Sequence, residues 1–164
     1  MREIDAQNLI RLYKLKKHPE GGYFREGYRS AGKIAGTGRH YSTAIYFLLE
    51  AGQMSRLHRI KSDELWHFYL GGPLELSQLT REGRTRRVVL GGDLLAGHKL
   101  QHMVPAGCWF GACPAKGTKF SFVGCTVAPG FEFDDFELGD RAKLLKKYPR
   151  ASAFIKKLTG TGTV

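Results

Sequence analysis

The fold of this chain is decided by residues 52–71, which read GQMSRLHRIKSDELWHFYLG. Two segments of this stretch, 55–59 and 64–70, have the composition of β-strands, and a short polar turn at 60–63 separates them. Strand segments joined by so short a connection are typical of an antiparallel hairpin. The stretch therefore predicts two adjacent strands and, through them, a β-rich fold.

Lys61 lies midway between His58 and Glu64. In a hairpin that turns at Lys61, these two side chains lie opposite each other and share a face. Because side chains alternate along a strand, the face of Glu64 also carries Trp66, Phe68 and Leu70. The opposite face carries Leu65, His67 and Tyr69.

A histidine and a carboxylate on one inward face are a general base with its orienting partner or two ligands of a metal. The alternative without a function is a satisfied polar pair inside a sandwich. Aromatic residues such as those around them are more often part of the core than the wall of a ligand pocket. The pair is the strongest functional candidate in the sequence.

The remainder of the chain continues the strand pattern at intervals of about 8–12 residues, which is typical of an all-β sandwich or barrel. A helix is expected at 5–15, before the turn-forming segment at 18–22. A second helical segment is expected at the C-terminal end, where Ala151, Phe154, Ile155 and Leu158 share one helical face. The further predicted strands are 22–28, 42–49, 74–80, 85–90, 99–104, 108–113 and 119–127.

The formal net charge is +11, from 26 basic and 15 acidic residues. Seven of the basic residues lie in 141–157, which has no acid, and five acids precede them in 130–140. A nucleic-acid interface is the alternative that such charge raises. We favour a helix that packs on the barrel and turns its lysines to solvent. A second basic cluster lies at 81–87, on a predicted hairpin. We interpret it as a device for solubility or for protecting a sheet edge rather than as a binding site.

Other features exclude whole classes of protein. The longest apolar run, 43–49, is far shorter than the ~20 residues of a membrane-spanning helix. The N-terminus lacks the apolar core of a signal peptide. The three cysteines have no zinc-ribbon spacing, which favours reduced, buried thiols. We therefore expect an intracellular, cytoplasmic protein without a membrane partner.

With these observations in place, residues 52–71 resemble the first cupin motif, G-x5-H-x-H-x3-E-x6-G. Gly52, His58, Glu64 and Gly71 match it at the right spacing, but Ile60 stands in the place of the second histidine.

Pro105 and Gly107 match part of the second cupin motif, G-x5-P-x-G-x2-H. Phe110 replaces its histidine and Lys99 its leading glycine.

The segments 18–26, 62–69 and 127–136 extend this resemblance to one small cupin family, a domain of unknown function, over about residues 5–158. The resemblance implies a mainly β, double-stranded β-helix (jelly-roll) barrel and a homodimer. We expect one cupin domain over residues 1–164. Its parts are a barrel at about 18–136, an N-terminal helix at 5–15 and a C-terminal helical segment at 139–158.

Metal-dependent cupins hold their ion with two histidines and a glutamate of the first motif and a histidine of the second. Of these four ligands this chain keeps His58 and Glu64. Catalytic metal sites typically have three protein ligands, so no cofactor is expected. The alternative is a divalent metal on His58 and Glu64, with Gln101, His102 or His67 as a substitute ligand.

At the level of fold, the family resembles the metal-independent sugar-nucleotide epimerases. That resemblance implies that His58 is the base, that Glu64 holds and tunes it, and that a tyrosine is the acid. The sequence leaves Tyr23, Tyr41 and Tyr46 open for that role.

We therefore expect the barrel to bind a small organic ligand, sugar- or nucleotide-like, with isomerase or epimerase activity as the first hypothesis. The alternatives are a metal-dependent enzyme, such as a dioxygenase with a degenerate ligand set, and a non-catalytic binding module. A nucleic-acid binder is the last alternative. The predicted catalytic residues are His58 and Glu64. The predicted ligand-binding residues are Tyr23, Arg25, Trp66, Phe68, Gln101 and Phe110.

Overall fold

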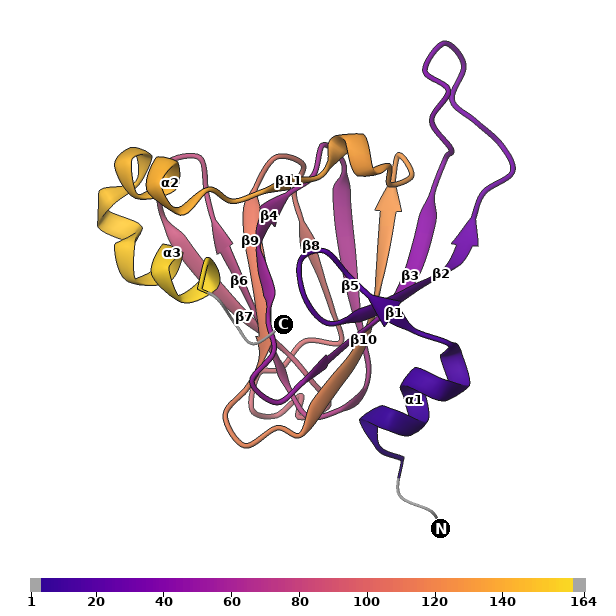
Figure 1. The fold of residues 1–164 in the computed structure, drawn as a ribbon, viewed down its shortest axis with the longest axis horizontal. Helices are drawn as coiled ribbons and strands as arrows, with labels where there is room; N and C mark the ends of the chain where they lie inside the picture. The colour runs from indigo at the N-terminus through magenta and orange to yellow at the C-terminus, as the bar shows by residue number, and fades with distance from the viewer. Residues whose placement is uncertain (1–3, 161–164) are drawn as a thin grey trace.

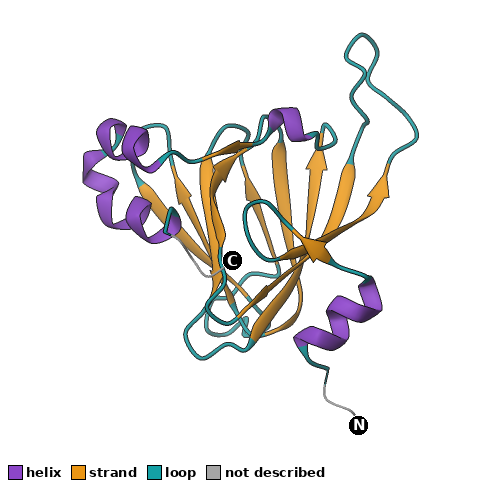
Figure 2. Ribbon diagram, viewed as in Figure 1, coloured by secondary structure: helices purple, strands orange, loops and turns teal. Residues whose placement is uncertain are grey.

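A computed structural model describes residues 4–160, which form two β-sheets of antiparallel strands with helices outside them (Figures 1 and 2). The strands are β1 (Lys16–Lys17), β2 (Tyr23–Arg29), β3 (Thr43–Glu50), β4 (Ser55–Arg59), β5 (Asp63–Gly71), β6 (Leu74–Leu79), β7 (Thr85–Leu90), β8 (Gln101–Val104), β9 (Trp109–Pro114), β10 (Phe120–Ala128) and β11 (Glu137–Leu138). One sheet has the strand order β1-β2-β3-β10-β5-β8, and the other has the order β11-β4-β9-β6-β7.

The helices are α1 (Ala6–Tyr13), α2 (Arg141–Lys147) and α3 (Ser152–Leu158), with short 3-10 turns at Phe133–Asp135 and Pro149–Ala151. In Figure 1, α1 lies on one side of the molecule, and α2 and α3 lie together on the other. This is the mainly β architecture with terminal helices that the sequence predicts. No helix within residues 4–160 has the length and apolar character needed to cross a membrane.

The nine strands predicted from the sequence are all present, and their ends shift by at most two residues. The prediction that residues 55–70 form a hairpin is wrong, however. β4 pairs with β9 and β11 in the five-stranded sheet, whereas β5 pairs with β10 and β8 in the six-stranded sheet. The turn between them crosses from one sheet to the other. Each strand finds its hydrogen-bond partners far along the chain, and adjacency in sequence does not reveal them.

The alternation predicted for β5 holds only for part of its length. Trp66 and Phe68 face the core between the sheets. The register against β10 then shifts, so that Phe68 pairs with Val123 but Leu70 pairs with Phe122. A bulge of this kind carries Leu70 to the outer face, where it packs with Phe122 beneath α1. The prediction that Leu70 shares the face of Glu64 is therefore wrong.

The C-terminal helices cover the outer face of the five-stranded sheet. Ile155 and Leu158 are almost fully buried there against Leu57 and Trp109. Burial of each such aliphatic side chain contributes about 1.5–3 kcal/mol. The lysines of α3 remain exposed, so the predicted apolar stripe with a solvated basic face is confirmed. Trp109 meets the covering helices while Phe110 points inward, as expected for neighbouring residues of one strand.

The N-terminal helix closes part of the six-stranded sheet. Asp5 caps it by accepting a hydrogen bond from the Asn8 amide at 2.7 Å. Leu9 and Ala6 are buried against Leu48 and Phe122 on the outer face of that sheet. The chain that follows α1 turns inward, so residues 18–20 reach the space between the two sheets.

Candidate functional site

A cavity lies between the two sheets at the end where β2, β3, β4 and β5 meet the segment 131–136. About 80 Å³ of it is open to the centres of water molecules, which is room for several waters or one compact organic molecule. Its walls combine phenylalanines with a small set of ionisable groups, as small-molecule sites commonly do. The histidines and charged residues that line it are His18, Glu20, His58, Glu64 and, towards the rim, Glu26, Arg29 and Glu132; Thr43 and Cys125 also line it.

His58 is buried on β4, and both of its ring nitrogens are engaged. Nδ1 lies 2.7 Å from the carbonyl oxygen of Arg56. Because a carbonyl only accepts, Nδ1 carries a proton and donates it. Nε2 lies 3.1 Å from Oε2 of Glu20. Burial lowers the pKa of His58 to about 4, which makes its neutral form the stable one at neutral pH.

Glu20 is a site residue that the sequence reasoning missed. It is buried, its Oε1 accepts a hydrogen bond from the Ser55 hydroxyl at 2.7 Å, and its Oε2 faces Nε2 of His58. Burial is the main cause that raises the pKa of Glu20. With Nδ1 of neutral His58 protonated, a hydrogen bond to Nε2 requires a proton on the glutamate. Glu20 and His58 therefore form a carboxylic acid–imidazole pair that shares one proton.

The signal for Glu20 is present in the sequence, in the turn 18–22 with its two glycines. Gly21 has a φ of +112°, and a Cβ there would meet the carbonyl oxygen of Met54 at 2.1 Å. Only glycine fits this approach. Glu20 lies in this tight turn, between two strands, and its side chain enters the cavity. The alternation of side chains along strands does not predict the direction of a residue in a turn.

Glu64 reaches the cavity from β5, in the sheet opposite His58. Burial raises its pKa to about 8, repulsion from Glu20 adds to this when Glu20 is ionised, and a hydrogen bond with the Cys125 thiol opposes it. The carboxyl group is thus largely protonated at neutral pH, yet it ionises within the physiological range. The prediction that His58 and Glu64 share one site is confirmed, but they reach it from strands of two different sheets and not from one hairpin.

His18 is the second residue that the sequence reasoning missed. Its Nδ1 accepts a hydrogen bond from the backbone amide of Glu20 at 3.2 Å. Its ring stands edge-on to Phe24 and stacked against Phe133, with centroid distances of 4.5 and 6.1 Å. Burial lowers its pKa. A protonated Nε2 on this ring is a hydrogen-bond donor available to a ligand in the cavity.

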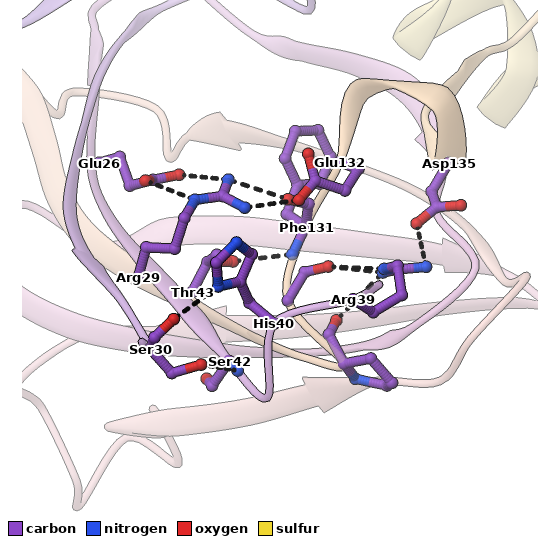
Figure 3. Close-up of polar contacts among 12 residues, drawn as sticks. Glu26, Arg29, Ser30, Arg39, His40, Ser42, Thr43, Phe131, Glu132 and Asp135 are labelled. Carbon is purple, nitrogen blue, oxygen red and sulfur yellow. Dashed lines mark hydrogen bonds and ion pairs between the residues drawn. The ribbon is translucent and has the colours of Figure 1, made fainter. Parts of the chain in front are cut away.

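Arg29 joins the rim of the cavity to the segment that closes it (Figure 3). Its Nε and Nη2 donate to the two carboxylate oxygens of Glu26, each at 2.9 Å. Its Nη1 pairs with Glu132, and Nη2 also donates to the carbonyl oxygen of Phe131. The two glutamates raise the pKa of Arg29 above its already high ordinary value.

Arg39 fixes the same segment from the loop between β2 and β3 (Figure 3). It donates to the carbonyl oxygen of Gly130 and forms an ion pair with Asp135. The Phe131 amide in turn donates to the hydroxyl oxygen of Thr43 at 2.9 Å. Residues 130–136 are thereby held as a lid across the cavity.

The six predicted ligand-binding residues lie elsewhere than in the walls of this cavity. Trp66, Phe68 and Phe110 belong to the core, where Phe110 packs on the ring of His58 at a centroid distance of 4.1 Å. Arg25 donates to the carbonyl oxygen of Tyr13.

The remaining two of the six lie on outer surfaces. Tyr23 packs beneath α1, and the Gln101 side-chain amide contacts Nδ1 of His67 at 3.2 Å. The other predicted tyrosine acids also lie outside the cavity walls. Tyr46 stacks on Phe122 at the outer face of the six-stranded sheet, and Tyr41 is mostly exposed.

The donor set does not fit the four-ligand metal site of the cupin motifs. Ile60 and Phe110 present hydrocarbon where two histidines would stand, and Nε2 of His58 is occupied by Glu20. Within residues 4–160 no three histidine, cysteine, aspartate or glutamate side chains are grouped so as to hold a metal ion. The substitutes considered from the sequence are engaged elsewhere: His67 contacts Thr126, and His102 contacts Gln78.

Two solved structures resemble this chain throughout. A crystal structure of a protein from Shewanella oneidensis has a TM-score of 0.90 and 40% identity, covering 96% of this chain and 99% of that one. A hypothetical protein from Leishmania major has a TM-score of 0.88 and 38% identity, covering 94% and 98%. An uncharacterized protein of Saccharomyces cerevisiae is 27% identical over 146 residues, which are 79% of this chain and 72% of that protein.

A more distant likeness concerns the fold alone. Oxalate decarboxylase from Bacillus subtilis matches with a TM-score of 0.57 at 13% identity, over 89% of this chain and 37% of that one. These neighbours confirm the predicted jelly-roll fold. The relation to sugar-nucleotide epimerases stays a prediction. The family model described as Cupin superfamily (DUF985) matches residues 7–139, and the chain therefore belongs to this cupin family, whose function is unknown.

Proposed function

We propose that the protein binds a small organic carbonyl compound in the cavity and isomerises it by proton transfer. The observation that carries this proposal is a pair of buried carboxyl groups, Glu20 and Glu64, that share one cavity but have different partners. Carboxyl groups in unlike environments divide into an acid and a base. The cavity supplies both roles with this chain's own residues.

Glu64 is the better base of the two. A general base works best when its pKa lies near the working pH, and the pKa of Glu64 is raised to about 8 by burial. Its hydrogen-bond partner, the Cys125 thiol, is a weak donor, so the carboxylate keeps its basicity. The predicted base, His58, has both nitrogens engaged, which favours a different role for it.

Glu20, backed by His58, is suited to be the acid. Its one proton lies between Oε2 and Nε2 of His58 at the inner wall of the cavity. Turning this hydroxyl from the imidazole to a bound ligand makes Glu20 a donor in the cavity. Ser55 fixes the second carboxyl oxygen. A neutral carboxylic acid held in this way stabilises a developing oxyanion by a hydrogen bond or by proton transfer.

The proposed reaction needs no oxidant or reductant. Glu64 carboxylate removes a proton from the carbon beside the carbonyl, and the electron pair of the C–H bond moves to the carbonyl oxygen. That oxygen takes the proton of Glu20 and an enol results. For an α-hydroxy carbonyl compound this enol is an enediol. Glu64 returns its proton on the same face to the former carbonyl carbon, the neighbouring hydroxyl gives its proton back to Glu20 and becomes the new carbonyl, and the isomer results.

The size of the cavity supports a compact ligand. The open space is suited to a single ring or a short chain rather than a whole nucleotide. Of the sugar- and nucleotide-like ligands expected from the sequence, monosaccharide-sized compounds are therefore favoured. Phenylalanine walls add an apolar face against which such a compound packs.

Solvent exchange tests this proposal directly. The protein in deuterated water is mixed with cyclohexanone or hydroxyacetone, and loss of the proton signal beside the carbonyl is followed by NMR. We expect exchange above the buffer rate, a loss of at least tenfold in Glu64→Gln, and no change in the exposed control Glu137→Gln. Exchange of both compounds at the buffer rate, or equal exchange by Glu64→Gln, contradicts the proposal.

A further inference from the structure

The cavity has an unequal balance of charged groups. Within residues 4–160 its walls contain four glutamates and a single arginine, and no lysine. Two of the glutamates, Glu20 and Glu64, lie deep in the cavity, and Glu26 and Glu132 lie at its rim with Arg29. This balance contrasts with the net charge of +11 of the whole chain. The interior of the barrel is thus acidic inside a basic protein.

The arginine is not free to receive an anion. Its guanidinium group already donates to both oxygens of Glu26, to Glu132 and to the carbonyl oxygen of Phe131. A ligand carboxylate or phosphate would have to displace one of these charge-assisted bonds, which are among the stronger hydrogen bonds of proteins. It would then stand close to two or more glutamates. The geometry disfavours anionic ligands.

Aromatic rings provide the rest of the wall. Phe24, Phe131, Phe133 and Phe136 come from β2 and from the lid. Phe131 and Phe133 meet edge to face at a centroid distance of 5.1 Å. The faces of such rings attract cations, most strongly when the cation is desolvated. Rings and carboxyl groups that converge on one enclosed space suit a positively charged organic group.

We propose that the cavity selects a compact organic cation, an ammonium group on the same small body that carries the carbonyl group, with Glu64 as its ion partner. This inference rests on the proposed function, because it names the substrate class of the same site. A positive charge beside Glu64 favours its carboxylate form. The bound cation therefore ionises the group that serves as the base, and binding releases a proton at neutral pH.

The other groups that face Glu64 do not replace it as the ion partner. Cys125 on β10 keeps its proton, because burial raises its pKa well above the ordinary value. Glu20 is occupied by His58 and Ser55. His18 lies on the turn next to Glu20, and burial lowers its pKa, so it stays neutral. Glu64 is left as the carboxyl group that a cation meets in the deep part of the cavity.

Three probes of matched shape test the inference: cyclohexylammonium, cyclohexanol and cyclohexanecarboxylate. Calorimetry at pH 7 measures their affinity, and NMR locates them through the resonances of cavity residues. We expect the ammonium compound to bind at least tenfold more tightly than the alcohol, and the carboxylate to bind least. Titrations in phosphate and in Tris, which differ in ionisation enthalpy, should reveal release of a proton on binding of the cation.

Glu64→Gln should abolish both the preference for the cation and the proton release while cyclohexanol binding persists. Glu137→Gln, on the exposed surface, should behave as the unchanged protein. Equal binding of cation and alcohol, tighter binding of the carboxylate, or no binding of any probe overturns the inference. Carbonyl exchange by the protein with equal binding of the probes leaves the proposed isomerisation intact and removes only the cation preference. If the protein prefers the cation but shows no carbonyl exchange, the cation preference is supported and the proposed isomerisation is contradicted.

Discussion

Nε2 of His58 lies 3.1 Å from Oε2 of Glu20, at the inner wall of a cavity between two β-sheets. The two residues come from a β-strand and from a turn far away in the chain. Because Nδ1 of His58 donates to the Arg56 carbonyl, the contact requires one proton between imidazole and carboxyl. This shared proton makes the environment of Glu20 different from that of Glu64.

The first prediction concerns the shared proton itself. In Glu20→Gln, the amide oxygen accepts from Ser55 and the amide nitrogen donates to Nε2 of His58, so both hydrogen bonds persist. We expect the free energy of unfolding, measured with urea, to change little. Glu20→Ala leaves the imidazole nitrogen and the Ser55 hydroxyl unsatisfied, which costs about 1–3 kcal/mol. Equal losses in the two variants would show that no proton lies between these side chains.

The second prediction concerns the dependence of stability on pH. The pKa of Glu64 rises on folding from 4.5 to about 8, so its contribution is complete below pH 4.5 and is lost as pH rises through 8. The pKa of His58 falls from 6.5 to about 4, so its contribution is present above pH 6.5 and is lost as pH falls through 4. The two oppose each other between pH 4.5 and 6.5.

Between pH 6.5 and 8 only the Glu64 effect remains of these two, and the raised pKa of Glu20 acts in the same direction. We expect the free energy of unfolding to fall there by about 1.4 kcal/mol per pH unit for one proton. Urea titrations across this range measure the slope. Glu64→Gln should remove most of it, and a slope unchanged in that variant would refute the assignment.

The third prediction concerns metals. Protein incubated with excess Zn²⁺, Mn²⁺ or Ni²⁺ and then dialysed should retain far less than one ion per chain by elemental analysis, because the donor set lacks two of the four cupin ligands. Ile60→His restores the missing histidine of the first motif next to His58 and Glu64. We expect it to retain more zinc than the parent protein. A full equivalent of metal in the parent, lost in His58→Ala, would contradict this prediction.

The fourth prediction concerns the lid. Arg29→Gln removes the group that joins Glu26, Glu132 and the Phe131 carbonyl. We expect faster amide hydrogen exchange in residues 130–136 and a loss of about 1–3 kcal/mol, since hydrogen bonds to charged groups are at stake. Arg87→Gln, which breaks the surface pair with Glu75, is the control and should cost about 0–1 kcal/mol. Unchanged exchange in the lid would argue against its anchoring by Arg29.

The fifth prediction concerns the homodimer expected from the family resemblance, which we propose forms through the outer face of the six-stranded sheet. Tyr69 and Met103 are exposed on neighbouring strands, β5 and β8, beyond the region that α1 covers. Exposed apolar surface of this kind is typical of protein interfaces. Light scattering should give twice the 18.4 kDa of one chain, and the double variant Tyr69→Arg/Met103→Glu should give a monomer. The same mass for parent and variant would exclude this face.

The sequence by itself determined the strands, the terminal helices and their solvated basic face. Period-two alternation and a helical stripe depend on neighbouring residues only, and those are visible in any single sequence. The same local pattern singled out His58 and Glu64, because polar groups at inward positions of apolar strands are costly unless they are satisfied or used.

Only the tertiary structure decided which strands pair and what the two residues face. β4 and β5 follow each other in the chain but join different sheets, since their hydrogen-bond partners are distant in sequence. Glu20 enters from a glycine turn that has no strand period to place it. The protonation of Glu20, His58 and Glu64 follows from burial in a shared cavity, a property of the assembled barrel that no local pattern encodes.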